Sequence, residues 1–326
     1  MPVLLLTNDD GPPSAASPYV FAFYHHLIAL GWDVKVVLPS SQKSWIGKAF
    51  HITEITKGRY FYPNKPHGLT GETSETSRPL KDGEVAEWIL LDGTPATCAN
   101  VALHNLYPGE IDLVVSGPNL GRNTSSAFAL SSGTLGAAMS ASLTKTRAIA
   151  VSYGTILHPT PTTYFEPAHV LASRIVHHLW SNWGQDEGGL RSGEVDLYNI
   201  NVPLVEALLT DQGLKTLWTF MHRNSYGRLF KAVSSAASEP SVSAAGPDAL
   251  DPPSTASTSS ANTLAFEFSP AMEGLIHPEE SSLPPGSDAY AILKGWASVT
   301  PLRSSFAEPP AEQPKDVEGR VWKMKL

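Results

Sequence analysis

Short apolar runs alternate with amphipathic stretches through the first 203 residues of the chain. The all-aliphatic run at residues 3–6 predicts a strand that is buried on both of its faces. Further strands are predicted at residues 33–39, 87–91, 111–117, 148–154 and 196–203. Helices are predicted at residues 19–30, 96–106, 133–143 and 166–180. Strands that alternate with helices imply right-handed crossovers, so the pattern predicts an α/β sandwich with a mostly parallel sheet.

The pattern changes in the second part of the chain. Residues 233–263 are rich in Ser, Ala and Pro, and we expect a disordered insertion because they contain too few large apolar side chains to offset the cost of ordering. Strands are expected on both sides of it, at residues 218–222 and 264–268, and residues 288–302 suggest a strand pair that returns to the fold. We therefore divide the chain into a core at 1–205, a β-rich region at 206–303 and a tail at 304–326.

Composition and charge narrow the class of protein. The net charge is −8 and no block of Lys and Arg is present, which argues against a nucleic-acid polymer as the main partner. The single cysteine, Cys98, excludes an intramolecular disulfide and fits a reducing compartment. We expect no membrane partner and no signal peptide, because no apolar run approaches the roughly 20 residues of a membrane span and no basic segment precedes the first strand. The expected location is the cytoplasm.

Small polar residues follow four of the predicted strands. They lie at residues 7–11, 40–44, 92–95 and 116–123. Ligands bind outside the carboxyl ends of parallel strands, so we expect these loops to meet at one edge of the sheet. Asp9 and Asp10 are adjacent carboxylates that repel each other, which indicates a positive group between them or a retained proton.

These loops offer oxygen donors rather than sulfur or imidazole. Such donors favour a hard cation, Mg²⁺, Mn²⁺ or Ca²⁺, over zinc. The segment Ser131, Ser132, Gly133 and Thr134 stands at the start of a predicted helix, where free N–H groups and the positive end of the helix dipole suit a phosphate. A metal beside an anion site is the arrangement for metal-assisted phosphoester hydrolysis.

Each of these features also has a purely structural interpretation. An Asp-Asp pair after a strand is a helix cap or a turn in roughly two cases of three. The residues before Gly133 suit helix capping as well as phosphate binding. Chance explains each motif alone much better than it explains their joint placement after successive parallel strands.

Four segments together, in this order, resemble the stationary-phase survival protein SurE family: LLLTNDDG, LDGTPATC, VVSGPNLGRN and SSGTLGAAM. The later segments LYNINVP and WASVTPL are similar to further landmarks of that family, and the resemblance covers residues 2–203 and resumes near Asp288. It implies a Rossmann-like three-layer sandwich with a smaller β-rich C-terminal extension that takes part in homodimers or homotetramers. It also implies a divalent-metal-dependent 5′-nucleotidase or acid phosphatase that acts on nucleoside monophosphates and other phosphoesters.

The resemblance also implies roles for individual residues. The metal ligands correspond to Asp9, Asp10, Ser44 and Asn119, and one of the two aspartates is the expected proton acceptor. Bacterial relatives place the serine in an RSG-type sequence where this chain has Lys43-Ser44-Trp45, so Ser40 and Ser41 remain alternatives to Ser44. The residues expected to hold phosphate are Asn8, Asn123, Ser131, Ser132, Gly133 and Thr134.

Two other functions remain open from the sequence. The unusual segment PPSAASPY after Gly11 motivates a nucleotide- or phosphate-binding protein without turnover. The fold class by itself also suggests a dinucleotide-binding oxidoreductase. No Gly-x-Gly-x-x-Gly follows the first strand, which argues against the oxidoreductase.

Overall fold

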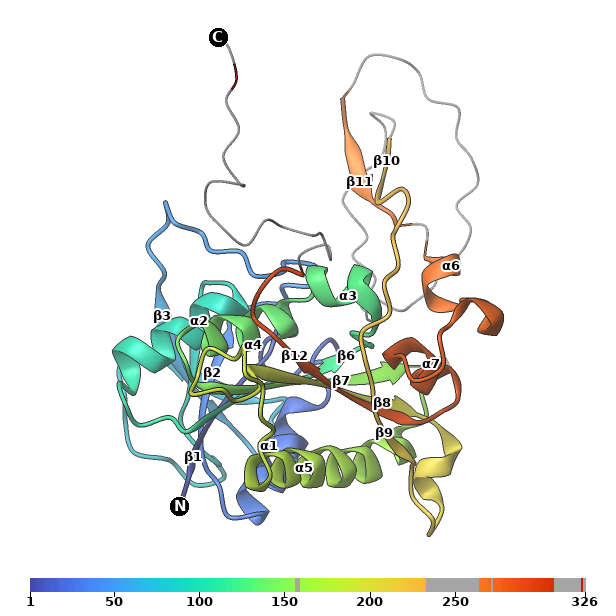
Figure 1. The fold of residues 1–326 in the computed structure, drawn as a ribbon. Coiled ribbons are helices and arrows are strands. Elements are labelled where there is room, and N and C mark those ends of the chain that lie inside the picture. Colours follow the sequence, from blue (N-terminus) through green and yellow to red (C-terminus); the bar gives the residue numbers. More distant parts are fainter. Residues whose placement is uncertain (156–158, 233–263, 271, 308–323, 325–326) are drawn as a thin grey trace.

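The computed structural model describes residues 1–155, 159–232, 264–270, 272–307 and 324 (Figure 1). The insertion predicted at 233–263 and most of the predicted tail lie outside these described residues. Within the described ranges, no helix combines the length and the apolar character needed to cross a membrane.

A ten-stranded sheet forms the centre of the molecule, in the order β4-β3-β5-β2-β1-β6-β7-β8-β12-β9. Its strands are β1 (Val3–Thr7), β2 (Asp33–Pro39), β3 (Gly58–Pro63), β4 (Gly71–Ser74), β5 (Trp88–Leu91), β6 (Leu113–Leu120), β7 (Arg147–Thr155), β8 (Leu197–Leu204), β9 (Thr216–Trp218) and β12 (Ala297–Leu302). The six strands from β5 to β8 in this order pair in parallel, whereas β3, β4 and β12 pair antiparallel to their inner neighbours. The predicted mostly parallel sheet is therefore confirmed.

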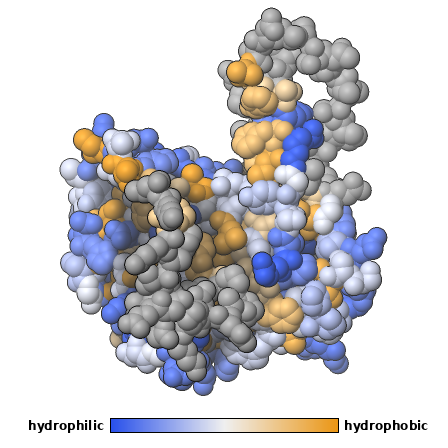
Figure 2. Space-filling view, turned by 45° about the horizontal axis from the view of Figure 1, so that its top comes forward, coloured by the Kyte–Doolittle hydropathy of each residue, from blue (hydrophilic) through white to orange (hydrophobic). Residues whose placement is uncertain are grey.

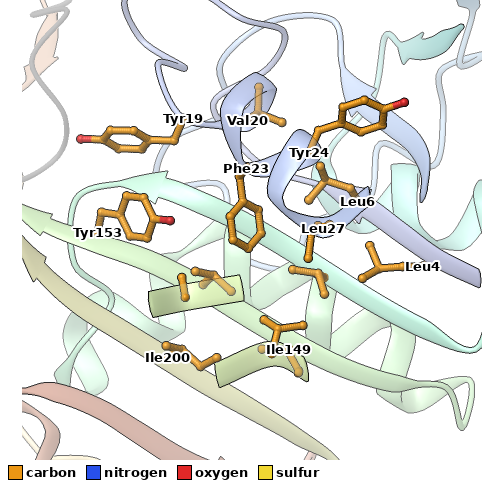
Figure 3. Close-up of a cluster of buried hydrophobic side chains, with 14 of the residues drawn as sticks. Leu4, Leu6, Tyr19, Val20, Phe23, Tyr24, Leu27, Ile149, Tyr153 and Ile200 are labelled. Atoms are coloured by element: carbon orange, nitrogen blue, oxygen red, sulfur yellow. The ribbon is translucent and has the colours of Figure 1, made fainter. Parts of the chain in front are cut away.

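Helices cover both faces of this sheet. They are α1 (Val20–Ala29), α2 (Pro95–Val101), α3 (Ser125–Ser131), α4 (Gly133–Leu143) and α5 (Phe165–Ser181), with a π-helical turn at Ala102–Leu106 that continues α2. Leu4 and Leu6 of β1 pack into one core cluster with α1 and α5, while Leu5 packs into another with α2 and α4. Figure 3 shows the first cluster, where Phe23 and Leu27 of α1 lie over the strands. The side chains of a strand alternate between its faces, so one aliphatic run supplies both cores.

Two short elements from the region beyond residue 205 extend the main sheet. β12 lies between β8 and β9, so β9 joins the sheet only through β12. The strand predicted at 218–222 instead ends at Trp218, because the chain then turns to pair with the segment around Ser287.

The strand pair predicted at residues 288–302 is wrong in its first half. Residues Asp288–Leu293 form helix α7, and only Ala297–Leu302 is a strand. The side chain of Ser287 accepts a hydrogen bond from Tyr290 N at 3.2 Å and so caps this helix. A Ser followed by Asp in the first turn is a helix-start signal that outweighs the short apolar run behind it.

A second, two-stranded sheet projects from the body beside helix α6 (Glu273–Ile276) (Figure 1). It consists of β10 (Phe230–Ala232) and β11 (Phe266–Phe268), which pair antiparallel. Figure 2 shows hydrophobic side chains on this projection, and its three phenylalanines are 45% to 62% exposed.

The order of the strands places a crevice at the end of β1. From β1 the chain moves to β2 and β5 on one side, and it then returns to β6 on the other side of β1. Crossovers that leave in opposite directions open a space at the carboxyl ends of the two neighbouring strands, which is where α/β sheets bind ligands.

Candidate functional site

A narrow pocket of about 10 Å³ opens where β1 and β6 end. Its lining residues are Asp9, Ser44, Trp45, Asn119, Asn123, Phe128, Ser131 and Ser132. The loops after β1, β2 and β6 therefore do meet at one edge of the sheet. Polar groups predominate in the lining, and Trp45 and Phe128 contribute its aromatic surface.

Asp9 follows β1 and is 3% exposed. The hydroxyl of Thr134 donates to its Oδ1 at 2.7 Å, and the backbone N–H groups of Gly133 and Thr134 also hydrogen-bond to this carboxylate. A Cβ on Gly133 would lie 2.8 Å from Asp9 Cβ, so only glycine permits this approach. The start of α4, expected to face a phosphate, therefore directs these donors at Asp9. Burial raises the pKa of Asp9, and the hydrogen bonds oppose that rise.

Asp10 is 2% exposed and lies outside the pocket lining. Its Oδ2 accepts a hydrogen bond from Leu120 N at 2.8 Å, and the Gln42 side chain also hydrogen-bonds to this carboxylate. Its Oδ1 is buried without a hydrogen bond of ordinary geometry among the described residues. Burial and then the neighbouring charge of Asp9 raise the pKa of Asp10 well above its usual value. A buried carboxylate oxygen without such a bond is costly, and a bound cation beside Asp9 and Asp10 would relieve that cost.

Asn119 reaches the pocket through an irregularity in β6. The register with β7 shifts between Ser116 and Asn119, and Gly117 within it has φ +120°. A Cβ on Gly117 would lie 2.1 Å from Val151 O, so the bulge depends on glycine. Asn119 Nδ2 donates to Gly121 O at 2.8 Å, which leaves the side-chain oxygen as the group available to a ligand.

Ser44 lies on a loop that is fixed at both ends. Lys43 N donates to Asp9 O at 2.7 Å, and Gly47 N donates to Ser131 O at 2.8 Å. Ser44 lines the pocket, whereas Ser40 and Ser41 do not. Of the three serines considered from the sequence, the structure therefore brings Ser44 to the other donors.

Asn123 is held by polar side chains that the sequence analysis did not select. Its backbone N donates to Asn201 Oδ1 at 2.7 Å, its O accepts from Asn199 Nδ2 at 2.8 Å, and its Nδ2 donates to Ser152 Oγ at 2.8 Å. Asn199 and Asn201 are two residues apart in a fully buried strand. Two asparagines on one face of an otherwise apolar strand are the signal that identifies them.

Asn8 does not reach the pocket. Its Nδ2 donates to Gly11 O at 2.8 Å, and its Oδ1 accepts from Gly11 N at 2.9 Å. Ser17 Oγ accepts a further hydrogen bond from Asn8 Nδ2 at 3.1 Å. Asn8 therefore holds the turn that positions the two aspartates, and its carboxamide faces that turn rather than a phosphate.

The donor set suits a cation that prefers oxygen ligands. The carboxylate of Asp9, a hydroxyl and a carboxamide oxygen line the pocket, and the buried carboxylate of Asp10 follows Asp9 in the chain. The described part of the chain contains no cluster of three or more His, Cys, Asp or Glu side chains arranged for a metal. Such a set matches Mg²⁺, Mn²⁺ or Ca²⁺ in its chemistry. The residues present therefore fit the group that the sequence predicts.

Comparisons with known proteins agree with this geometry. A family model described as "Survival protein SurE" matches residues 4–228. The "5'-nucleotidase SurE" of Acinetobacter baylyi is 28% identical over 307 residues, which cover 92% of each chain. The "Probable tubulin--tyrosine ligase PBY1" of Saccharomyces cerevisiae is 38% identical over 229 residues. That match covers 64% of this chain but only 29% of the yeast protein, so the chain spans less than a third of that relative.

A solved structure shares the fold. The crystal structure of the SurE protein from Aquifex aeolicus matches with a TM-score of 0.58 and 22% identity. The match covers 94% of this chain and 95% of the other. The strands and helices that surround the pocket therefore belong to an architecture already observed in a SurE protein.

Proposed function

This chain belongs to the survival protein SurE family, and from that membership we propose that it is a divalent-metal-dependent phosphomonoester hydrolase. Its proposed substrates are nucleoside 5′-monophosphates, since relatives such as the Acinetobacter baylyi protein are named 5′-nucleotidases. The observation that carries the proposal is the buried Asp9–Asp10 pair, in which Asp10 Oδ1 lacks a hydrogen bond of ordinary geometry, placed at the switch point of a parallel sheet.

The residues proposed to hold the metal are Asp9, Asp10, Ser44 and Asn119. Their oxygens come from the loops after β1, β2 and β6, and three of the four line one pocket. When bound, Mg²⁺ or Mn²⁺ supplies positive charge that balances the two carboxylates and polarises the phosphate.

The remaining polar residues divide between the phosphate and the carboxylates. Asn123, Ser131 and Ser132 line the pocket and are proposed to contact phosphate oxygens, where negative charge builds up during displacement. The Ser132 hydroxyl only accepts a hydrogen bond, from Leu135 N, whereas Asn123 Nδ2 and Ser131 Oγ would have to exchange their bonds to Ser152 Oγ and Ala127 O for a phosphate oxygen. Gly133 and Thr134 hold Asp9 in position through the hydrogen bonds described above. A water that attacks in line with the leaving oxygen passes its proton to a carboxylate, and we assign this role to Asp9 because it faces the pocket.

The wider organisation is proposed on the same basis. Residues 1–205 supply the proposed ligands, and residues 206–303 form an extension that serves assembly into homodimers or homotetramers, while residues 304–326 form a tail. The exposed phenylalanines on β10 and β11 support an assembly role for the extension. A cytoplasmic location is proposed from the single cysteine and the absence of a spanning helix in the described residues.

Phosphate release tests the proposal directly. The chain is incubated with a panel of nucleoside 5′-monophosphates and one aryl phosphate, first with EDTA and then with Mg²⁺ or Mn²⁺ restored. We expect release that EDTA abolishes and the metal restores. Nucleotide binding without release under any divalent metal would instead identify a binding protein on the same fold.

A further inference from the structure

Trp45 has a backbone conformation that bulky residues rarely adopt. Its φ is 60°, in the left-handed region where glycine is the usual residue. The loop cannot relax easily, because Lys43 and Gly47 on either side are hydrogen-bonded to Asp9 and Ser131. A strained tryptophan held beside a binding pocket indicates a functional constraint.

Three aromatic rings surround the Trp45 indole. The ring centroids of Phe268, Phe128 and Tyr226 lie 5.3, 6.1 and 6.3 Å from it, each at an edge-on angle between 61° and 68°. Phe128 belongs to α3, whereas Tyr226 and Phe268 come from the extension on either side of residues 233–263. Edge-on neighbours fix the plane of an aromatic ring, so the orientation of the indole is set by three separate segments.

Trp45 and Phe128 line the pocket on the side where we expect the leaving group of a substrate to lie. The pocket of about 10 Å³ has room for about one water, so a phosphate that approaches Asp9 occupies its mouth and the rest of an ester lies farther out. The rest of the molecule then lies beside Trp45 and Phe128. Phe128 is 3% exposed and is covered by Met272 and Ile276, whereas the half-buried Trp45 retains accessible surface.

We propose that Trp45 determines specificity by stacking on a planar aromatic ring in the leaving group. This inference rests on the proposed function and adds the residue that distinguishes a nucleotide from the same sugar phosphate without its base. Stacking tolerates different bases because each presents a flat face. The chain therefore prefers phosphomonoesters with a nucleobase or aryl group over aliphatic ones, without selecting strongly among bases.

A purely structural role for Trp45 makes a different prediction. An indole that only attaches the extension to the body affects all substrates equally when it is removed. A pair of substrates that differ only in the base separates these roles. Adenosine 5′-monophosphate and ribose 5-phosphate share the phosphate and the 5′-oxygen leaving group, so a selective effect on the nucleotide reports the contact with the ring.

The test compares the parent chain with Trp45→Gly and Trp45→Phe. Glycine accepts the positive φ without strain, so Trp45→Gly is expected to fold, and Trp45→Phe keeps an aromatic face as the matched control. Isothermal calorimetry in EDTA, where the proposed hydrolysis stops, measures the dissociation constants of both ligands. We expect Trp45→Gly to weaken the binding of adenosine 5′-monophosphate by about 10-fold more than the binding of ribose 5-phosphate. Trp45→Phe is expected to retain most of the preference for the nucleotide.

Two results would overturn the inference. One is a parent chain that binds the nucleotide no more tightly than the sugar phosphate, and the other is an equal change for both ligands in Trp45→Gly. Phosphate release measured on the same proteins with Mg²⁺ restored separates this inference from the proposed function. Selective binding without release contradicts only the proposed function, whereas metal-dependent release with the same preference in parent and Trp45→Gly contradicts only the role of Trp45.

Discussion

The base and the rim of the pocket are built in different ways. The base consists of Asp9, Asn119 and Asn123 in the pocket lining, together with the adjacent Asp10. All four are 2% to 4% exposed and are positioned by strand ends and by the start of α4. The rim consists of Trp45, which lines the pocket from a surface loop, and of Tyr226 and Phe268, which contact the Trp45 ring from the extension and are nearly half exposed. The residues of the proposed phosphate chemistry are thus held by the sheet, whereas the proposed recognition of the leaving group belongs to a surface loop and the extension.

Charge separates the two regions as well. The base contains two buried carboxylates whose pKa values are both raised, chiefly by burial. The rim rings carry no charge at neutral pH and interact through their faces and edges. Changes in the base are therefore expected to affect every substrate and to depend on pH and metal, while changes in the rim are expected to depend on the substrate.

The largest effect is expected from Asp10→Asn. Loss of a metal-binding carboxylate should lower phosphate release by at least about 10³-fold for all substrates. In EDTA the thermal midpoint should equal or exceed that of the parent, because the change removes a buried like charge beside Asp9. The exposed residue Asp211 supplies the control Asp211→Asn. Activity within tenfold of the parent would exclude Asp10 as a metal ligand.

Asn201→Ala extends the comparison to the support of the base. The change leaves the buried Asn123 N–H without its acceptor, which should cost about 1–3 kcal/mol of stability in urea unfolding. Misplacement of Asn123 should lower kcat/KM by about 10- to 100-fold for adenosine 5′-monophosphate and for ribose 5-phosphate alike. Asn105→Ala, at an exposed position, is the control. A selective loss with adenosine 5′-monophosphate would contradict the assignment of Asn123 to the phosphate.

Low pH should weaken metal binding at the base of the pocket and leave the ligand preference set by the rim unchanged. The metal binds the deprotonated carboxylates, so its affinity should fall by about tenfold per pH unit below the raised pKa of Asp10. Without metal, in EDTA, the folding stability changes with pH in the opposite direction to the metal affinity. The folded state binds this proton more tightly than the unfolded state, so the contribution of Asp10 to stability is present at low pH and is lost as pH rises through its raised pKa.

Calorimetric titration with Mn²⁺ across the acid range measures the first effect, and thermal unfolding in EDTA measures the second. The preference of adenosine 5′-monophosphate over ribose 5-phosphate should stay constant over the same range. A preference that changes with pH in parallel with metal affinity would show that base and rim are not separate.

The smallest effect is expected from Phe268→Ala on β11. Phe268 supports one edge of Trp45 at 5.3 Å, so its removal should lower kcat/KM for adenosine 5′-monophosphate by about threefold. Ribose 5-phosphate should change less, and Phe306→Ala, at a side chain that is 93% exposed, serves as the control. An equal loss for both substrates would mean that the extension acts on the base of the pocket.

The sequence predicted the parallel strands of the sheet and the meeting of three of the four loops expected at its edge. The antiparallel strands Gly58–Pro63 and Gly71–Ser74 were not predicted, and the loop at residues 92–95 does not line the pocket. Side chains after parallel strands must gather at one edge, so the convergence of Asp9, Ser44 and Asn119 follows from strand order and chain direction alone. The sequence did not predict the orientation of the Asn8 side chain. A carboxamide beside Gly11 either closes its own turn or faces a ligand, and a side-chain rotamer decides between them.

The rim was not predicted because long-range packing creates it. Nothing local to Trp45 indicates Tyr226 or Phe268, which reach it only when the extension folds back over the loop after β2. The helix Asp288–Leu293 was missed for a related reason, since its short apolar run also suits a strand and its Ser287 cap decides the outcome. Patterns of a few residues specify elements, whereas contacts between distant segments specify the aromatic surface.

The position of β12 between β8 and β9 has a consequence for folding during synthesis. A ribosome makes β9 long before β12, yet β9 meets the sheet only through β12. Asp288 is also made late. Its carboxylate accepts hydrogen bonds from the backbone N–H groups of Ser125 and His222. The nascent chain thus carries Asp9 and Asp10 well before it holds Asp288, which fixes the backbone at Ser125 and His222. On the proposed function, the chain completes its fold around Ser125 and His222 only after residues far from Asp9 and Asp10 in the order of translation have been made.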